Sequence, residues 1–371
     1  MRVAYDYQIF SSQKYGGISR YFFELSDRIA NQSDIDVRVI CPFYTNAYIG
    51  SCSKNLHVSG KKMPSIRWTG CVRGITNRLF SQLMMANFKP DLVHETYYLQ
   101  NSVAPFASKV VLTVYDMIHE RFPEYFTTKS LTTKKAAAIK RADHIISISH
   151  NTKKDICNFF GIEEKKITVV HLGFSGFKST HTINDRKFES IESRPFLLYV
   201  GNRSEYKNFE LFVRAVSESD NLMKEFDIIA FGGGNFKRNE IQLMSQLGYK
   251  QDQVRLATGS DIYLGYLYQN AAAFIYPSLY EGFGLPPLEA MVNNCPVVAS
   301  NTSSMPEVIG DAAEFFDPKS TEQIRHAIEK VVFSSERTKQ LINLGRERLK
   351  QFSWEKCAAE TLNVYKSILS S

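Results

Sequence analysis

The chain has 371 residues, which suggests two domains at roughly 100–200 residues each. Its 22% charged and 44% hydrophobic residues are typical of a soluble globular protein and exclude a disordered or fibrous one. The apolar runs are too short to span a membrane, the N-terminus lacks a signal-peptide pattern, and the six cysteines include no C-x-x-C pair. We therefore expect a cytoplasmic protein with reduced thiols and no structural zinc.

The net charge of +7 is distributed unevenly. Residues 1–180 contain 24 Lys and Arg against 14 Asp and Glu, a balance of +10, which leaves −3 for the remainder. No acidic residue occurs between Asp36 and Asp91, although this interval contains four lysines and four arginines. Its MPSIRWTGCVRGITNRLFSQLMMANF segment reads either as an ordinary domain helix with a core-facing apolar stripe or as an interfacial amphipathic helix. Residue by residue we favour the ordinary helix, but for the region as a whole we favour contact with an anionic membrane surface, and we disfavour nucleic-acid binding.

Short β-branched runs alternate with helical patterns in the first half of the chain. The pattern predicts helices over 18–30, 75–86, 132–141 and 151–160, and strands over 3–6, 36–41, 92–94, 110–114, 144–147 and 167–171. The polar, aperiodic segment 174–195 then reads as a linker between two domains.

The alternation begins again after this linker, with strands predicted over 196–200, 226–231, 273–276, 296–299 and 313–315. Two such series predict an α/β fold with two Rossmann-like, doubly wound parallel sheets that face each other across a cleft. We expect an N-terminal domain over 1–175, a C-terminal domain over 195–352 and a final helix over 353–371. The apolar spacing in FSWEKCAAETLNVYKSILSS makes this helix amphipathic, so we expect it to cross back to the first domain.

The segment YPSLYEGFGLPPLEAM (276–291) contains the most specific pattern. A strand leads into a glycine loop, and Pro286-Pro287 then suit the first turn of a helix. Glu281 in the loop and Glu289 in the helix are eight residues apart. Two carboxylates beside a helix N-terminus suit a ligand that carries both phosphate and hydroxyl groups.

With PVVASNTSSMPEVIG after it, this segment resembles the C-terminal signature of glycosyltransferase family 4, a family of retaining enzymes with the GT-B fold. The resemblance implies that Glu281 and the backbone of Phe283, Gly284 and Leu285 bind the sugar hydroxyls, and that Glu289 binds the ribose.

The resemblance extends upstream to YVGNRSEYKNF (199–209) and FGGGNF (231–236). It implies that Arg203 and Lys207 bind the donor pyrophosphate, where fixed cations stabilise the leaving group without a metal. It also implies that the glycine turn around Gly233 lines the nucleotide pocket.

In the first half, SQKYGGISRY (12–21) places Gly16 and Gly17 between a strand and a helix. In this family, a Gly-Gly loop at this place contacts the donor phosphate. TVYDMIHERFPEYF (113–126) also resembles the family, but Tyr115 replaces the histidine that many members have before the aspartate. Asp116 is retained, and His119 lies one helical turn later, so we expect these two residues to orient the reacting sugar. His94 either faces the acceptor or is a buried structural residue.

The resemblance therefore implies hexosyl transfer, with retention, from a nucleotide-diphosphate sugar. The motifs look most like those of bacterial mannosyltransferases that build O-antigen, lipopolysaccharide or capsule. This suggests GDP-mannose as the donor, a polyprenyl-diphosphate-linked saccharide as the acceptor, and a peripheral position at the inner face of the plasma membrane.

No cofactor or metal ion is expected, and we interpret the aspartates of SDID (33–36) as structural turn residues. An NAD-dependent oxidoreductase is disfavoured because neither half has a G-x-G-x-x-G fingerprint. Three alternatives stay open from the sequence: a UDP-sugar-dependent enzyme of the same family, a nucleotide-sugar 2-epimerase-like enzyme, and a non-catalytic sugar-nucleotide binder.

Overall fold

The computed structural model describes the chain except for residues 33, 65–69, 127–129, 177–193 and 371. The described residues form two compact units. The N-terminal unit comprises Met1–Gly173 and Phe352–Ser371, and the C-terminal unit comprises Phe174–Gln351. Most of the predicted linker, residues 177–193, lies outside the described residues.

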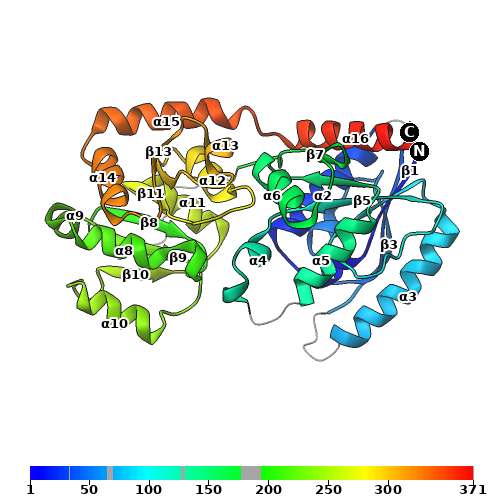
Figure 1. The fold of residues 1–371 in the computed structure, drawn as a ribbon, viewed down its shortest axis with the longest axis horizontal. Coiled ribbons are helices and arrows are strands. Elements are labelled where there is room, and N and C mark those ends of the chain that lie inside the picture. The colour runs from blue at the N-terminus through cyan, green and yellow to red at the C-terminus, as the bar shows by residue number, and fades with distance from the viewer. Residues whose placement is uncertain (33, 65–69, 127–129, 177–193, 371) are drawn as a thin grey trace. The chain divides into compact units, whose positions relative to one another are not determined.

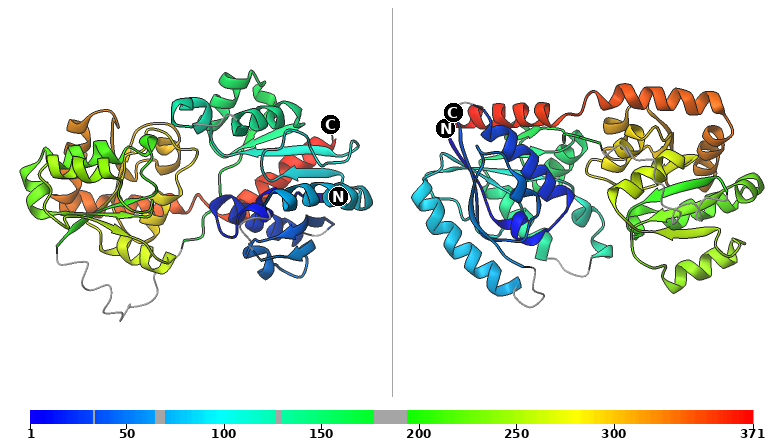
Figure 2. Two further views of the ribbon diagram at one scale, coloured as in Figure 1. Left: turned by 90° about the horizontal axis from the view of Figure 1, so that it is seen from below. Right: turned by 180° about the vertical axis from the view of Figure 1, so that it is seen from behind.

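The N-terminal unit is built on a parallel sheet of seven strands in the order β3-β2-β1-β4-β5-β6-β7. Helices cover both faces of this sheet (Figures 1 and 2). The strands are β1 (Arg2–Tyr5), β2 (Asp36–Tyr44), β3 (His57–Lys62), β4 (Leu92–Glu95), β5 (Lys109–Val114), β6 (His144–Ser147) and β7 (Ile167–Val169). The α-helices are α1 (Gln8–Ser12), α2 (Gly17–Ala30), α3 (Gly70–Phe88), α4 (Ile118–Arg121), α5 (Ser130–Arg141), α6 (His150–Phe160) and α16 (Trp354–Ser370).

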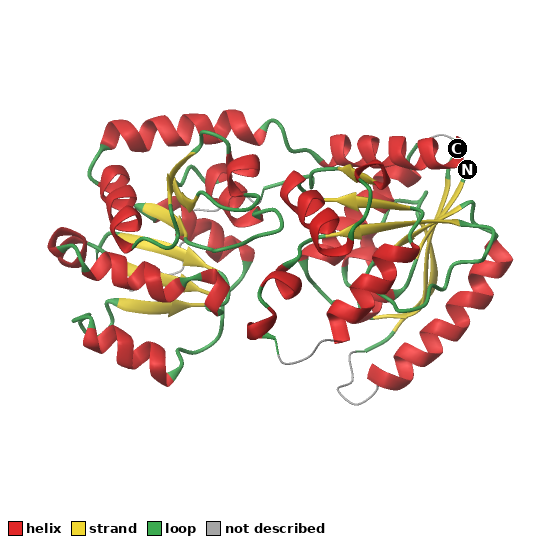
Figure 3. Cartoon of the chain, viewed as in Figure 1, coloured by secondary structure: helices red, strands yellow, loops and turns green. Residues whose placement is uncertain are grey.

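The C-terminal unit repeats this arrangement on six parallel strands in the order β10-β9-β8-β11-β12-β13 (Figure 3). They are β8 (Phe196–Val200), β9 (Asp227–Phe231), β10 (Val254–Ala257), β11 (Ala273–Tyr276), β12 (Val297–Ser300) and β13 (Ala313–Phe316). The helices are α8 (Phe209–Ser217), α9 (Asp220–Glu225), α10 (Arg238–Gln246), α11 (Asp261–Asn270), α12 (Leu285–Val292), α13 (Met305–Ile309), α14 (Thr321–Val332) and α15 (Ser335–Leu349).

The two doubly wound sheets confirm the predicted fold class, and every predicted strand is present within two or three residues of its predicted bounds. The sequence missed only β3 and β10 among the described strands. Both lie at sheet edges and are not fully buried, so their sequences HVSGKK and VRLA lack the apolar run that identifies a central strand.

The C-terminal helix α16 returns to the N-terminal unit and packs against α2, as predicted. A buried polar chain holds it there. The Tyr365 hydroxyl lies 3.0 Å from the Tyr5 hydroxyl and 2.6 Å from His94 Nδ1, and His94 Nε2 lies 2.8 Å from Thr113 Oγ1. These bonds satisfy polar groups that would otherwise destabilise the core, so they fix the position of α16 against the sheet.

Candidate active site

Four loops of the C-terminal unit meet beyond the carboxyl ends of neighbouring strands. They follow β8, β9, β11 and β12, which are adjacent in the sheet and parallel. Backbone and side-chain hydrogen bonds join them: Gly201 N–H donates to Phe231 O (3.0 Å), Leu279 N–H to Tyr206 O (2.7 Å) and Thr302 Oγ1 to Leu279 O (3.1 Å). The sequence motifs at 199–209, 231–236 and 276–291 therefore share one edge of the sheet, where doubly wound folds bind ligands.

Lys207 and Glu281 form an ion pair at this edge. Lys207 Nζ lies 2.5 Å from Glu281 Oε1, and the two side chains are 16% and 10% exposed. The Glu281 backbone is fixed on both sides, since its N–H donates to Ser303 Oγ (2.9 Å) and its carbonyl accepts from Ser304 Oγ (2.9 Å). Preorganised charges that are little hydrated interact strongly with a charged ligand. The pair thus presents a cation and a carboxylate that an incoming anion and a hydroxyl group can engage.

Tyrosine rings surround this pair. Lys207 Nζ lies 5.8 Å from the centre of the Tyr276 ring and 5.5 Å from that of Tyr206. Burial, followed by the negative charge of Glu281, raises the pKa of Tyr276 well above its usual value. Tyr276 therefore stays a neutral hydroxyl near neutral pH and lowers the local polarity around the ion pair.

Arg203 lies at the same edge, but its side chain is only 3% exposed. Its Nε donates to Glu240 Oε1 (2.8 Å), Nη1 to Gly232 O (3.1 Å), and Nη2 to both Gly234 O (2.9 Å) and Asn235 O (3.0 Å). Four of the five guanidinium N–H groups thus have acceptors inside the C-terminal unit. The aromatic ring of Phe236 covers the guanidinium at 4.7 Å.

The glycine turn after β9 wraps around this guanidinium. Gly232, Gly233 and Gly234 all have positive φ angles, of 90°, 75° and 71°, which L-residues with a side chain rarely adopt. A Cβ on Gly233 would lie 2.8 Å from Arg203 Nη1. The structure therefore gives Arg203 a task that the sequence did not indicate: it holds the turn together.

The α12 helix begins at the same edge. Its N-cap Gly284 has φ 108°, and prolines occupy its first turn, as the sequence predicted. Phe283 is buried, and its carbonyl accepts from Ser304 Oγ (2.9 Å). Glu289 is the fifth residue of α12, and its Oε2 accepts from the buried Tyr268 hydroxyl at 3.3 Å. The predicted donor residues of the second half thus lie on connected loops.

In the N-terminal unit, Gly16 and Gly17 precede and begin α2. The Gln13 side chain folds over this loop, and its Oε1 accepts from Ser19 N–H in the first turn of α2 (3.3 Å). Nothing lies within 4 Å of a Cβ built on Gly17. The Gln13 amide oxygen therefore occupies one of the first-turn N–H groups that can bind phosphate at a helix N-terminus. The surface beside Gly17 is not covered by other atoms.

Asp116 and His119 follow β5 and surround a buried lysine that sequence reasoning missed. Lys135, which is 1% exposed, donates to Glu120 Oε2 (2.8 Å) and Asp116 O (3.0 Å). His119 stacks on Phe126 at 3.9 Å. Burial, followed by the charge of Lys135, lowers the pKa of His119, so its imidazole is neutral near neutral pH. A buried lysine was not recognisable because the sequence does not show which cations lose contact with water.

Tyr115, which departs from the family pattern, points into the protein. Its ring is 7% exposed and lies 6.0 Å from that of Tyr21. His94 is fully buried in the polar chain that holds α16, and burial lowers its pKa to about 3. His94 is therefore a structural residue, the second of the two alternatives.

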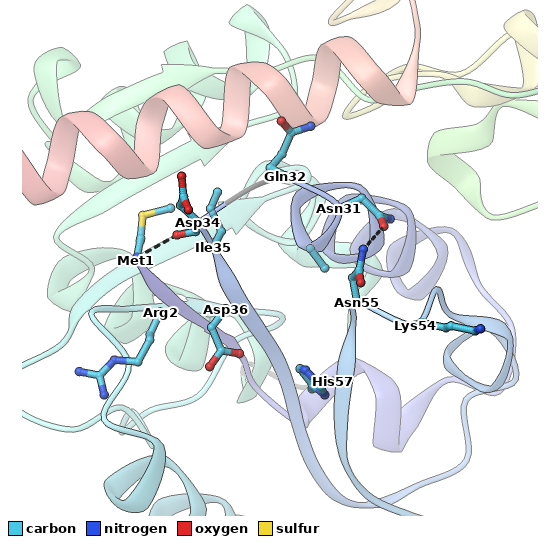
Figure 4. Close-up of a pocket in the computed structure, with 11 residues that line it drawn as sticks. Met1, Arg2, Asn31, Gln32, Asp34, Ile35, Asp36, Lys54, Asn55 and His57 are labelled. Atoms are coloured by element: carbon cyan, nitrogen blue, oxygen red, sulfur yellow. Dashed lines mark hydrogen bonds between the residues drawn. The ribbon is translucent and has the colours of Figure 1, made fainter.

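The SDID segment lies at the opposite end of the sheet from these loops. Ser33 is outside the described residues, Asp34 O accepts from the Met1 ammonium (3.1 Å), and Asp36 pairs with Arg38 (3.1 Å). Met1, Asp34 and Asp36 line an open cavity of about 700 Å³ at the amino ends of β1, β2 and β3 (Figure 4). Ligands of doubly wound folds bind at the carboxyl ends, so this cavity is separate from the candidate site.

Among the described residues, no helix is long and apolar enough to cross a membrane.

Two family models match the sequence. The model described as Glycosyltransferase Family 4 matches residues 15–175, and the one described as Glycosyl transferases group 1 matches residues 181–348. Together they cover most of the chain.

Curated relatives and solved structures agree with these matches. O-antigen chain mannosyltransferase B of Escherichia coli is 28% identical over 295 residues, which are 76% of each chain. O-antigen chain mannosyltransferase RfbU of Salmonella typhimurium is 28% identical over 232 residues, 61% of this chain and 62% of that one. The structure of sucrose-phosphate synthase from Thermosynechococcus elongatus superposes with a TM-score of 0.75 at 16% identity, covering 100% of this chain and 99% of the other.

Proposed function

The chain belongs to glycosyltransferase family 4 and has the GT-B fold, and on this premise we propose that it transfers mannose from GDP-mannose, with retention, to a lipid-linked saccharide. The product would be part of a bacterial surface polysaccharide such as O-antigen. The two O-antigen mannosyltransferase relatives support the sugar and the pathway class.

The single observation that carries this proposal is the Lys207–Glu281 pair. The pair lies where the loops after β8 and β11 meet, beside the glycine turn and the start of α12. A nucleotide-diphosphate sugar has a pyrophosphate next to sugar hydroxyls. The lysine can bind the pyrophosphate, and the glutamate in contact with it can accept hydrogen bonds from the sugar hydroxyls.

In the proposed donor complex, Lys207 exchanges Glu281 for the pyrophosphate, and Glu281 accepts hydrogen bonds from sugar hydroxyls. The backbone of Phe283, Gly284 and Leu285 contributes at the start of α12, and Glu289 binds the ribose. Arg203 acts through the glycine turn around Gly233, because most of its N–H groups are already bound there. Arg203 is then a positioning residue and Lys207 the cation at the leaving group.

From the N-terminal unit, Gly16 and Gly17 would approach the donor phosphate, while Asp116 and His119 would orient the reacting sugar. The bond between the anomeric carbon and the phosphate oxygen breaks, and a bond to the acceptor hydroxyl oxygen forms on the same face. The acceptor proton passes to the leaving phosphate oxygen. The protein supplies positioning and charge stabilisation, so we propose that no metal ion is needed.

We propose a polyprenyl-diphosphate-linked saccharide as the acceptor, reached from the cytoplasmic face of the membrane. The balance of +10 in residues 1–180 supports an anionic partner on the N-terminal side. A lipid diphosphate and the headgroups around it are such a partner.

Donor choice is tested by thermal shift in the presence of EDTA. We expect GDP-mannose and GDP to raise the melting temperature more than UDP-, ADP- and dTDP-sugars do. Stabilisation by UDP-sugars alone would contradict GDP-mannose as the donor and would support the alternative of a UDP-sugar-dependent enzyme. A requirement for added Mg²⁺ or Mn²⁺ would contradict metal independence.

Transfer is tested by incubating the protein with GDP-mannose and synthetic polyprenyl-diphosphate-linked saccharides, followed by mass and NMR analysis of the lipid. We expect one added hexose with an α-linkage, which retains the donor configuration. Conversion of the nucleotide sugar without an acceptor would indicate an epimerase, and donor binding without any product would indicate a binding protein.

A further inference from the structure

The α3 helix presents four large apolar side chains to solvent, while two polar side chains share its buried face with Met85 and Phe88. Ile75, Leu79, Phe80 and Leu83 are 59%, 58%, 50% and 63% exposed. Asn77 and Ser81, in contrast, are fully buried together with Met85. At about 100° per residue, the exposed side chains form one continuous stripe along the helix. A helix that covers a sheet usually turns such an apolar stripe towards the core.

A specific hydrogen-bond pair fixes this orientation. The Asn77 side-chain amide binds both backbone groups of Phe43: Phe43 N–H donates to Oδ1 (2.7 Å), and Nδ2 donates to Phe43 O (2.9 Å). The pairing of β2 with β3 shifts register between Ile40 and Phe43, and β1 pairs with β2 only as far as Val39. The Asn77 amide therefore bonds these backbone groups where β2 has a strand neighbour on one side only. Because the amide satisfies them only when it faces inward, the apolar stripe must face outward.

Cations border the stripe at both ends of the helix. Lys61 and Lys62 end the strand that leads towards α3, and Lys89 follows its last residue, and all three are exposed. Among the described residues, none of the three pairs with a carboxylate, and no Asp or Glu occurs between Asp36 and Asp91. Apolar side chains that penetrate acyl chains, with lysines at headgroup level, are the features of a helix that lies in a membrane interface.

We propose that α3 docks the protein on a bilayer that contains anionic lipids, with Leu79 and Leu83 at the centre of the contact. A symmetric dimer fits this surface less well, because a twofold axis through the stripe would bring the unpaired lysines of two copies together. The reason for such docking, access to a lipid-linked acceptor, rests on the proposed function. The docking itself is measured without donor or acceptor.

The test is flotation with vesicles of phosphatidylcholine, with or without phosphatidylglycerol. We expect the wild type to bind the anionic vesicles, and added salt to weaken this binding because it screens the lysines. The double variant Leu79→Ser/Leu83→Ser should bind at least about tenfold more weakly, since it loses most of the inserted apolar area.

A matched control is Ile241→Ser/Phe333→Ser, which alters two apolar side chains of the C-terminal unit that are 54% and 47% exposed. This control should bind vesicles as the wild type does. Both variants should keep the melting temperature and the GDP-mannose thermal shift, because the replaced side chains are largely exposed.

Three results would overturn the docking proposal: no wild-type binding to anionic vesicles, equal loss in the control variant, or a wild-type dimer in light scattering that becomes a monomer in Leu79→Ser/Leu83→Ser. The last result would assign the stripe to a second copy of the chain. Vesicle binding without any hexosyl transfer would instead contradict the proposed function and leave the docking intact.

Discussion

The two units share the same strand order around their first strand, but the helices that follow their outermost strands bury different kinds of side chain. In the N-terminal unit, α3 follows the edge strand β3, and in the C-terminal unit, α11 follows the edge strand β10. The α11 helix buries Tyr263, Leu264, Leu267 and Tyr268 in the usual manner. The α3 helix buries Asn77 and Ser81 and exposes its leucines. At equivalent places in the two sheets, α11 therefore turns its leucines towards the core and α3 turns its leucines towards solvent.

The carboxyl-end loops differ as well. In the C-terminal unit, the loops carry a largely buried lysine and glutamate in contact with each other. In the N-terminal unit, the cation Lys135 is fully buried among Asp116 and Glu120, and Tyr115 points inward. The C-terminal unit therefore offers charges to a ligand, while the N-terminal unit offers glycines and a positioned loop.

The largest effect should come from breaking the Lys207–Glu281 pair. We expect Lys207→Ala and Glu281→Ala each to lower kcat/KM by about 100- to 1000-fold, as loss of one transition-state donor does in other enzymes. Steady-state transfer assays measure this. Lys330→Ala serves as a control, because it removes another lysine of the C-terminal unit, paired with Glu314 at 2.8 Å, and should leave the rate unchanged. Wild-type rates in both pair variants would remove these residues from the site.

The next effect separates Arg203 from Lys207. If Arg203 holds the glycine turn, Arg203→Lys should weaken GMP and GDP binding by the same factor, about tenfold, measured by calorimetry. Glu240→Gln should reproduce this, since Glu240 accepts the hydrogen bond from Arg203 Nε. Lys207→Ala should instead weaken GDP much more than GMP. If Arg203→Lys weakens the binding of GDP but not of GMP, Arg203 binds the pyrophosphate directly.

Gly17→Ala tests the N-terminal unit. A Cβ there meets no atom within 4 Å, and alanine favours a helix by about 1 kcal/mol over glycine, so the melting temperature should stay equal or rise. Donor affinity should nevertheless fall severalfold if a phosphate approaches this backbone. Unchanged affinity in a stable Gly17→Ala protein would show that the donor does not reach the loop.

The last effect concerns stability at low pH and the buried polar chain that holds α16, and it leaves the transfer reaction itself unchanged. His94 has a pKa of about 3 in the fold, against about 6.5 in an unfolded chain. As pH falls below about 6.5, the unfolded state takes up a proton that the fold rejects, so stability decreases by up to about 1.4 kcal/mol per pH unit. His94→Gln should lack this contribution, and its melting temperature should fall less steeply from pH 6.5 to pH 4.

Tryptophan fluorescence can follow this transition, because Trp354 begins the α16 helix of the N-terminal unit. Parallel pH profiles for the wild type and His94→Gln would contradict the assignment of His94 as a buried neutral residue.

The sequence by itself determined the two alternating β/α series, the C-terminal helix and the family, because these depend on local periodicity and on contiguous motifs. It also identified residues that the C-terminal unit brings to one sheet edge, since loops that follow adjacent parallel strands must meet there. The two edge strands escaped detection because their side chains are partly solvated and so need no apolar pattern.

Only the tertiary structure decided which partners these residues have. It paired Lys207 with Glu281, engaged Arg203 with the glycine turn, and buried Lys135 and His94, because burial and hydrogen bonding depend on contacts between distant segments. It also decided which way α3 faces. The apolar residues of this helix are visible in the sequence, but the outward orientation of Leu79 and Leu83 follows from the hydrogen bonds between Asn77 and the backbone of Phe43.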